Sequence, residues 1–85
     1  MALTGITPNP AGSNATFRYF VPSDINSAQL HIYNLQGTEV KSYKLSARGQ
    51  SDFTIQSAEL SKGVYLALIT GDGQISNAMR MVIAR

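Results

Sequence analysis

The sequence predicts an all-β domain, a small immunoglobulin-like β-sandwich of six or seven antiparallel strands. Several short segments alternate apolar and polar residues, which is the period of a β-strand with one buried face. Clusters of glycine, proline and small polar residues separate these segments at intervals typical of a sandwich. The chain has 85 residues, 44% of them hydrophobic and 14% charged. This is enough apolar material for one core but too short for two domains.

The first predicted elements are a short strand, a loop and a longer strand. Leu3–Ile6 is a candidate for a seventh strand. Residues 7–14 contain two prolines and a glycine, so we expect a lead-in loop in which no strand ladder can form. Residues 15–21 then alternate and predict a strand that ends at Pro22, with three apolar side chains on one side, Phe17, Tyr19 and Val21.

The middle of the chain predicts a hairpin. Residues 28–35 alternate, and the glycine at position 37 suits a turn with positive φ. Residues 39–45 continue as a strand whose apolar positions are unevenly spaced, which indicates a bulge or a partly exposed edge strand.

The second half predicts three further strands. A short strand over 52–56 leads into a tight crossover at 57–63 that tucks Leu60 into the core. Residues 64–70 are apolar on both faces, which is typical of a strand buried in the middle of a sheet. Gly71-Asp72-Gly73 predicts a hairpin tip, and the last strand runs over 75–84.

Composition narrows the classes of function. Seven Lys and Arg residues against five Asp and Glu give a net charge of +2, and the basic residues are scattered, unlike the clustered charge of a nucleic-acid module. There is no cysteine to form a disulfide. The first residues have neither a cationic start nor an apolar stretch of signal-peptide length. We expect residues 1–85 to be one domain excised from the C-terminus of a larger surface or secreted protein.

Residue types that carry chemistry are sparse, so we predict no catalytic residue, no metal site and no cofactor. His31 is the only histidine and has no cysteine or second histidine to complete a zinc site or a triad. The carboxylates fall mostly in turns or at strand ends, and Asp72 lacks the alternating ligands of a calcium loop. Exposed aromatics are the remaining hint of a ligand face, and Tyr33 and Tyr43 are the candidates.

Four motifs in order resemble a known family: Pro8-Asn9-Pro10-Ala11, the turn over 32–37, Leu60-Ser61-Lys62-Gly63-Val64-Tyr65, and the basic and aliphatic Arg80-Met81-Val82-Ile83. The chain is similar to the C-terminal sorting domain of type IX secretion cargo proteins of Bacteroidetes, the Por secretion tail family. Two departures are Asn34 where the family's turn often has Asp, and arginines where its last strand often has lysines.

The resemblance implies a non-catalytic sorting signal. It would direct an attached N-terminal cargo domain through the periplasm and across the outer membrane to the cell surface. The implied partner is the outer-membrane secretion machinery. Carried over by position, the motif residues are Pro8, Asn9, Pro10, Gly37, Gly63 and Tyr65. The terminal strand, with Arg80, Met81, Val82, Ile83 and Arg85, is the implied recognition strand.

One hypothesis for recognition is β-augmentation, in which a partner strand pairs with the exposed terminal strand while arginines supply charge. An edge strand would also permit oligomers. The alternative function is a structural or ligand-binding module, for carbohydrate or protein, at the end of a modular surface protein.

Overall fold

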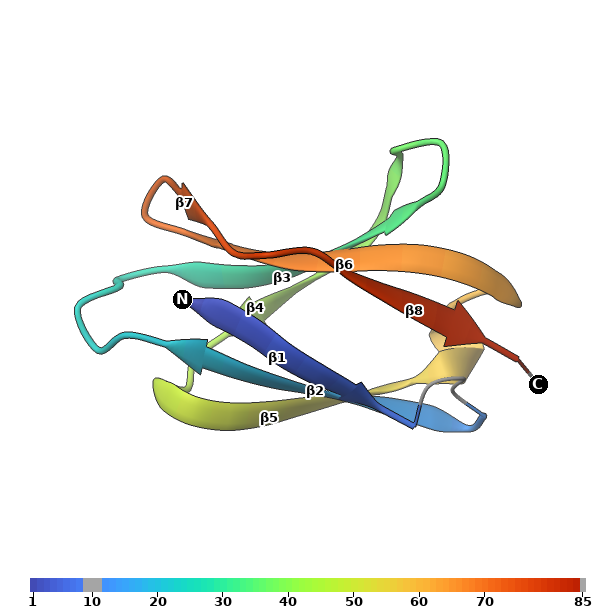
Figure 1. The fold of residues 1–85 in the computed structure, drawn as a ribbon, viewed down its shortest axis with the longest axis horizontal. Helices are drawn as coiled ribbons and strands as arrows, with labels where there is room; N and C mark the ends of the chain where they lie inside the picture. The colour runs from blue at the N-terminus through green and yellow to red at the C-terminus, as the bar shows by residue number, and fades with distance from the viewer. Residues whose placement is uncertain (9–11, 85) are drawn as a thin grey trace.

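Strands dominate the described residues, 1–8 and 12–84, and they form two antiparallel sheets in the computed structural model (Figure 1). The first sheet has the order β1–β2–β5. Its strands are β1 (Ala2–Thr7), β2 (Asn14–Val21) and β5 (Gly49–Gln56). A short 3-10 helix, η1 (Ser57–Glu59), leads from this sheet to the next.

The second sheet is centred on β6 (Gly63–Gly71). On one side β6 pairs with β3 (Ala28–Asn34), which pairs in turn with the edge strand β4 (Glu39–Leu45). On its other side β6 pairs with two short strands, β7 (Gln74–Ile75) and β8 (Met79–Ile83). The order of the two sheets is that of an immunoglobulin-like sandwich: β1, β2 and β5 correspond to strands A, B and E, and β4, β3, β6 and β8 to C′, C, F and G. The predicted fold class is confirmed.

The core lies between the sheets and is built by strand alternation. In β2 every second side chain is buried, and β3 and β6 bury theirs against them from the second sheet. Fully burying one such side chain contributes on the order of 1.5–3 kcal/mol. The largest fully buried side chains are Tyr19, Phe17, Leu3, Leu30, Ile32, Ile69, Met81, Ile83 and Val21.

Several element boundaries differ from the sequence prediction because of pairing between distant segments. β5 begins at Gly49 rather than at position 52, since residues 49–51 pair with residues 19–21 of β2. Thr7 lies in β1 and Asn14 in β2, so the connecting loop is shorter than 7–14, and positions 9–11 of that prediction lie outside the described residues. The predicted bulge is confirmed by a register shift opposite Tyr33.

The predicted last strand is divided into β7 and β8 at Ser76. The Ser76 N–H donates to the Ile69 carbonyl and the Ser76 hydroxyl oxygen accepts from the Ile69 N–H, both at 2.8 Å. The Asn77 side chain then turns to β1, where its amide accepts from the Leu3 N–H (3.0 Å) and donates to the Leu3 carbonyl (2.9 Å). These contacts bring β8 alongside β1 of the first sheet, while β8 remains paired with β6 of the second (Figure 1).

The hairpin between β6 and β7 has the predicted two-residue turn. Asp72 and Gly73 both have positive φ, 49° and 82°, as a type I′ turn requires. The Asp72 carboxylate accepts from the backbone N–H groups of Asn26 (2.7 Å) and Ser27 (3.1 Å), which fixes the β2–β3 loop against the hairpin. Gly71 leaves room for that loop, because a Cβ there would lie 3.0 Å from the Ser27 carbonyl oxygen.

Arg48 closes the same end of the sandwich. Its guanidinium donates to the carbonyls of Ile25 (2.8 Å) and Asn26 (3.1 Å) in the β2–β3 loop. It also donates to the carbonyls of Leu45 (3.1 Å) and Ala47 (2.9 Å) before β5. One side chain therefore joins two loops that the strands alone leave separate.

We predict that Arg48→Ala destabilises the domain by about 2 kcal/mol or more, because four carbonyls lose a charged donor. Urea denaturation of the purified domain measures this loss. Arg18→Ala is the control: the Arg18 Nε lies 3.4 Å from Asp52 Oδ1 in an exposed pair, and such pairs are worth about 0–1 kcal/mol. Equal losses in the two variants would contradict the role assigned to Arg48.

Candidate functional site

The glycine motif at position 37 shapes the β3–β4 hairpin. Gly37 has a φ of 87°, which few residues other than glycine adopt. The Asn34 side-chain oxygen accepts from the N–H groups of Gln36 and Thr38, both at 3.0 Å. An aspartate oxygen at this position could accept in the same way.

The Gly63 and Tyr65 motif is also structural. Tyr65 is buried, and its hydroxyl donates to the Ser61 carbonyl at 2.6 Å. Leu60, predicted to lie in the core, is buried beneath the same crossover. Pro8 is exposed after β1, whereas Asn9 and Pro10 lie outside the described residues. The described motif residues therefore account for turns and packing rather than for a binding surface.

The terminal strand contributes to the core. Met81 and Ile83 are buried between the sheets, while Arg80 is exposed and Val82 is half-buried. Side chains alternate between the two faces of a strand, so a partner on the outer face can contact the side chains of Arg80 and Val82 but not those of Met81 and Ile83. Of the residues in the predicted recognition strand, Arg80 and Val82 are the ones whose side chains face outward. Arg85 lies outside the described residues.

The two tyrosines predicted to form one ligand face lie on opposite sides of the sheet. Tyr43 is paired with Leu30 and packs at the core edge with its ring 5.2 Å from that of Phe53. Tyr33 points outward, with its ring stacked 6.2 Å from His31. Tyr33 and Tyr43 therefore do not share one face, because the bulge in β4 changes which of its residues face inward.

His31 joins three strands on the outer face of the second sheet. Its Nδ1–H donates to the Glu39 carboxylate on β4, and its Nε2 shares a hydrogen bond with the Thr70 hydroxyl on β6 (2.7 Å). Hydroxyl, imidazole and carboxylate are the parts of a hydrolase triad. An oxyanion hole needs preorganised donors aimed at the reacting oxygen, but here β3 and β6 are interior strands whose backbones pair on both sides. The cluster is suited to holding strands together.

Outside the His31 cluster, the described residues offer little support for a metal site or a ligand cavity. The described residues contain no group of three or more His, Cys, Asp or Glu side chains able to hold a metal ion. A cavity of about 350 Å³ lies beside Asn26, Lys44 and Arg48, but the Arg48 donors there are directed to backbone carbonyls. Within the described part of the chain, no helix is long and apolar enough to cross a membrane.

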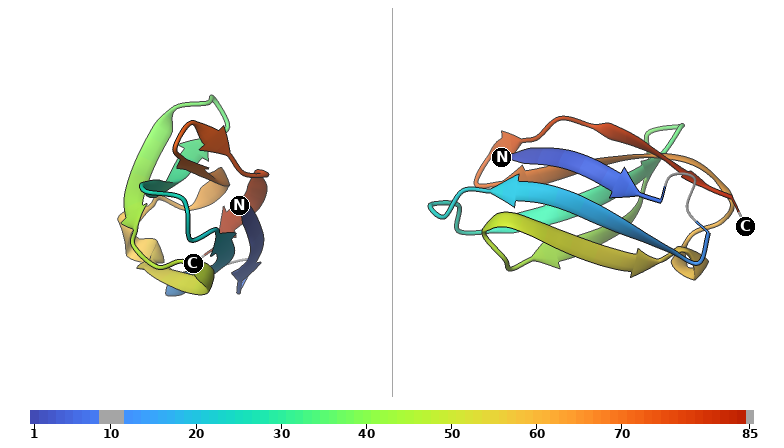
Figure 2. Two further views of the ribbon diagram at one scale, coloured as in Figure 1. Left: turned by 90° about the vertical axis from the view of Figure 1, so that its left-hand side faces the viewer. Right: turned by 60° about the horizontal axis from the view of Figure 1, so that its bottom comes forward.

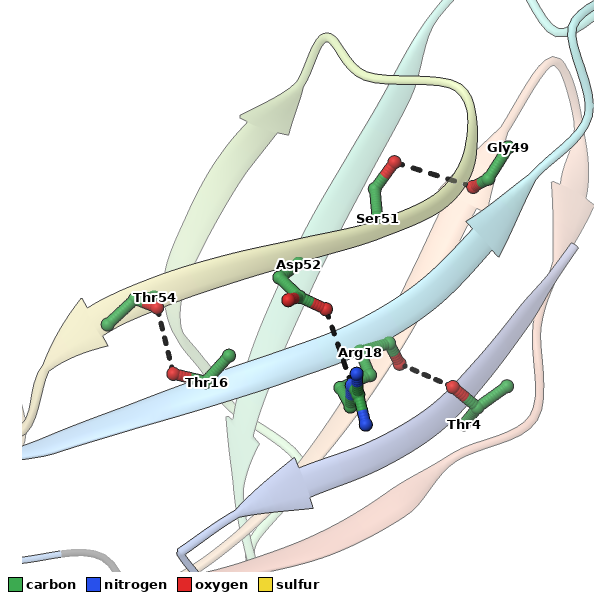
Figure 3. Close-up of polar contacts among 7 residues, drawn as sticks. All are labelled: Thr4, Thr16, Arg18, Gly49, Ser51, Asp52 and Thr54. Carbon is green, nitrogen blue, oxygen red and sulfur yellow. Dashed lines mark hydrogen bonds and ion pairs between the residues drawn. The ribbon is translucent and has the colours of Figure 1, made fainter.

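The outer face of the first sheet carries polar contacts between its strands (Figure 3), beside the half-exposed ring of Phe20. Thr16 and Thr54 share a hydrogen bond of 2.8 Å across β2 and β5. Arg18 pairs with Asp52 one row along, and the Thr4 hydroxyl donates to the Arg18 carbonyl at 3.1 Å. This is the pattern expected of a sheet face that water covers.

The outer face of the second sheet is different, because β6 directs Val64, Leu66 and Leu68 outward. Residues 64–70 are apolar on both faces, which predicted a strand buried in the middle of a sheet. The strand is indeed central, with partners on both edges, but only its inward side chains are covered. The signal for this surface was present in the sequence as a strand that is apolar on both faces.

The fold defines a small β-sandwich domain whose last strand, β8, lies beside β6 in the second sheet. The family model for the secretion system C-terminal sorting domain matches residues 5–84. The chain belongs to this family, whose members carry the sorting signal of type IX secretion cargo in Bacteroidetes, a non-catalytic role in export across the outer membrane. The resemblance in the sequence motifs is thereby confirmed. A comparison with curated proteins finds no matching relative.

Tyr43 predicts a pH dependence of stability. Burial raises the pKa of Tyr43 above its ordinary value, and the hydrogen bond to Glu59 (2.8 Å) and the charge of that carboxylate raise the pKa further. The folded state therefore keeps its proton above pH 10, where the unfolded chain loses it. The stabilisation is complete below about pH 10 and is lost as the pH rises beyond that. We expect the thermal midpoint of Tyr43→Phe to fall less between pH 8 and pH 11.5 than that of the parent domain. Midpoints that fall equally in the two proteins would contradict the role assigned to Tyr43.

Proposed function

We propose that this chain is the C-terminal sorting domain of a larger exported protein, and that the type IX machinery recognises it as a folded sandwich rather than as a linear tail. The observation that carries the proposal is the place of β8. This strand pairs with β6 along residues 79–83 and buries Met81 and Ile83. Its outward residues are therefore in a defined arrangement only when the whole sandwich has formed.

The positions of the chain ends support a cargo attached at the N-terminus. Met1 lies toward one end of the longest axis of the domain, which measures 37 Å, and the end of β8 lies toward the other (Figure 2). A cargo domain that precedes Met1 would leave the far end of the sandwich accessible. Such a protein would pass through the periplasm and reach the outer-membrane machinery with this domain presented, and then the cell surface or the medium.

The alternative, a carbohydrate-binding module, has weaker support. A sugar platform needs aromatic rings on one surface. Tyr33 and Tyr43 face opposite sides of their sheet, and Tyr43 is held by Phe53 and Glu59.

A fusion protein tests the sorting function. A reporter with a signal peptide is joined to the N-terminus of this domain and expressed in a Bacteroidetes strain with type IX secretion and in its secretion-deficient mutant. We expect the reporter outside the cells of the first strain and in the periplasm of the second. Equal export without the domain, or in the mutant, would contradict the function.

A second prediction separates the folded signal from a linear one. Ile83→Asp places a carboxylate in the core and should cost several kcal/mol, a large part of the stability of a small domain, so folding and export are both lost. Ala84→Asp changes an exposed neighbour and should keep both. Circular dichroism of the purified domains and export of the fusions are the measurements. Export of an unfolded Ile83→Asp domain would refute recognition of the fold.

A further inference from the structure

The edge of β5 is the least protected edge of the two sheets. Among the described strands β5 pairs with β2 alone, and the register between them continues without a shift over residues 49–56. Residues 50–56 contain no proline, lysine or arginine, and the charged residue of β5, Asp52, pairs with Arg18 of β2. A regular strand edge of this kind presents backbone N–H and C=O groups with which another strand can pair.

The other edges of the sandwich carry features that oppose strand pairing. β4 contains Lys41 and Lys44, and its register with β3 shifts at the bulge. β1 has a register shift between Leu3 and Gly5, and the Asn77 side chain bonds both the N–H and the carbonyl of Leu3. β7 and β8 are two and five residues long. Among the described strands, β5 therefore stands apart as a long and regular open edge.

Phe53 lies on this edge strand and is half-buried. Its side chain faces the space between the sheets, where it packs against the core and its ring lies 5.2 Å from that of Tyr43 on β4. In the register of the first sheet Phe53 is aligned with Phe17 of β2, which is fully buried. The row of aromatic side chains that crosses this sheet therefore ends at a ring that remains partly open to solvent.

A second copy of β5 fits the edge in an antiparallel register centred on Phe53. A two-fold axis at this residue places Phe53 opposite Phe53 of the other copy, Gln50 opposite Gln56, and Asp52 opposite Thr54. The aromatic row then continues from one copy into the other, and directly opposed aromatic side chains stabilise a pair of strands. No charges of like sign stand directly opposite each other in this register.

We propose that β5 is a dimerisation edge, through which two copies of this chain pair and join their three-stranded sheets into one continuous sheet. The paired backbones supply the hydrogen bonds, and Phe53 supplies the apolar centre of the contact. A second copy is the favoured occupant because its strand brings both the matching aromatic centre and the uncharged flanking residues. The contact is closed by its two-fold symmetry, so it gives dimers rather than filaments. The proposal does not depend on the sorting function, because it concerns the folded domain by itself.

Charge substitutions at two glutamines test both the edge and its register. Gln50 and Gln56 are exposed, and the residues directly opposite them in β2, Phe20 and Asn14, are uncharged. Sedimentation velocity of the purified domain should show a monomer–dimer equilibrium between about 10 μM and about 1 mM, as expected of a small interface. Gln50→Lys with Gln56→Lys places like charges opposite each other twice across the axis and should raise the dissociation constant at least about tenfold. Gln50→Lys with Gln56→Glu should return it to the parent value or below.

The matched control adds the same two charges away from β5. Gln36 and Gln74 are both exposed, and Gln36→Lys with Gln74→Lys should change the dissociation constant less than about threefold, since salt screens charges that lie far from the contact. Thermal denaturation establishes that each variant is folded.

Three results would overturn the proposal. A folded parent domain that stays monomeric at about 1 mM has no dimerisation edge. A dimer that the two lysine pairs weaken equally responds to net charge rather than to pairing through β5. A dimer that stays as weak with Gln50→Lys and Gln56→Glu as with the two lysines does not use the register centred on Phe53.

Discussion

Burial of the inward side chains of β2, β3 and β6 between two sheets is the constraint on which the rest of the molecule depends. A strand offers its side chains to its two faces in turn, so assigning Phe17, Leu30 or Ile69 to the core also assigns its neighbours to the surface. The terminal strand obeys the same rule, and Met81 and Ile83 belong to the core as much as any residue of β6 does. On the two outer faces, the outward side chains are therefore the ones that a partner of the folded domain can contact.

Polar side chains take the place that disulfides hold in many small sandwiches. The chain has no cysteine, and at 85 residues its core gives a modest margin of stability. Arg48 and Asp72 each tie the β2–β3 loop to another loop, and Asn77 joins the segment before β8 to β1. Each contact links segments far apart in sequence and opposes the opening of the sandwich at that place.

The residues of the sequence motifs and the outward residues of the two sheets are different sets in this domain. Gly37 shapes the β3–β4 turn and Tyr65 packs in the core and bonds the crossover before β6. They are poor candidates for contact with a partner, since Tyr65 is buried. The two outer faces also differ. That of the first sheet carries one threonine pair, the Arg18–Asp52 ion pair and Phe20, whereas that of the second carries Val64, Leu66 and Leu68 along β6.

By itself the sequence determined the local features: the strand over 15–21, the strand at 28–34, the Asp72-Gly73 turn and the family. These depend on side-chain period and on turn residues that lie next to one another. The tertiary structure alone decided that Tyr33 and Tyr43 face apart, that Ser76 divides the last strand, and that the outer face of β6 stays uncovered. The physical reason is that bulges, register and the covering of a sheet face arise from pairing between segments distant in sequence, which periodicity does not specify.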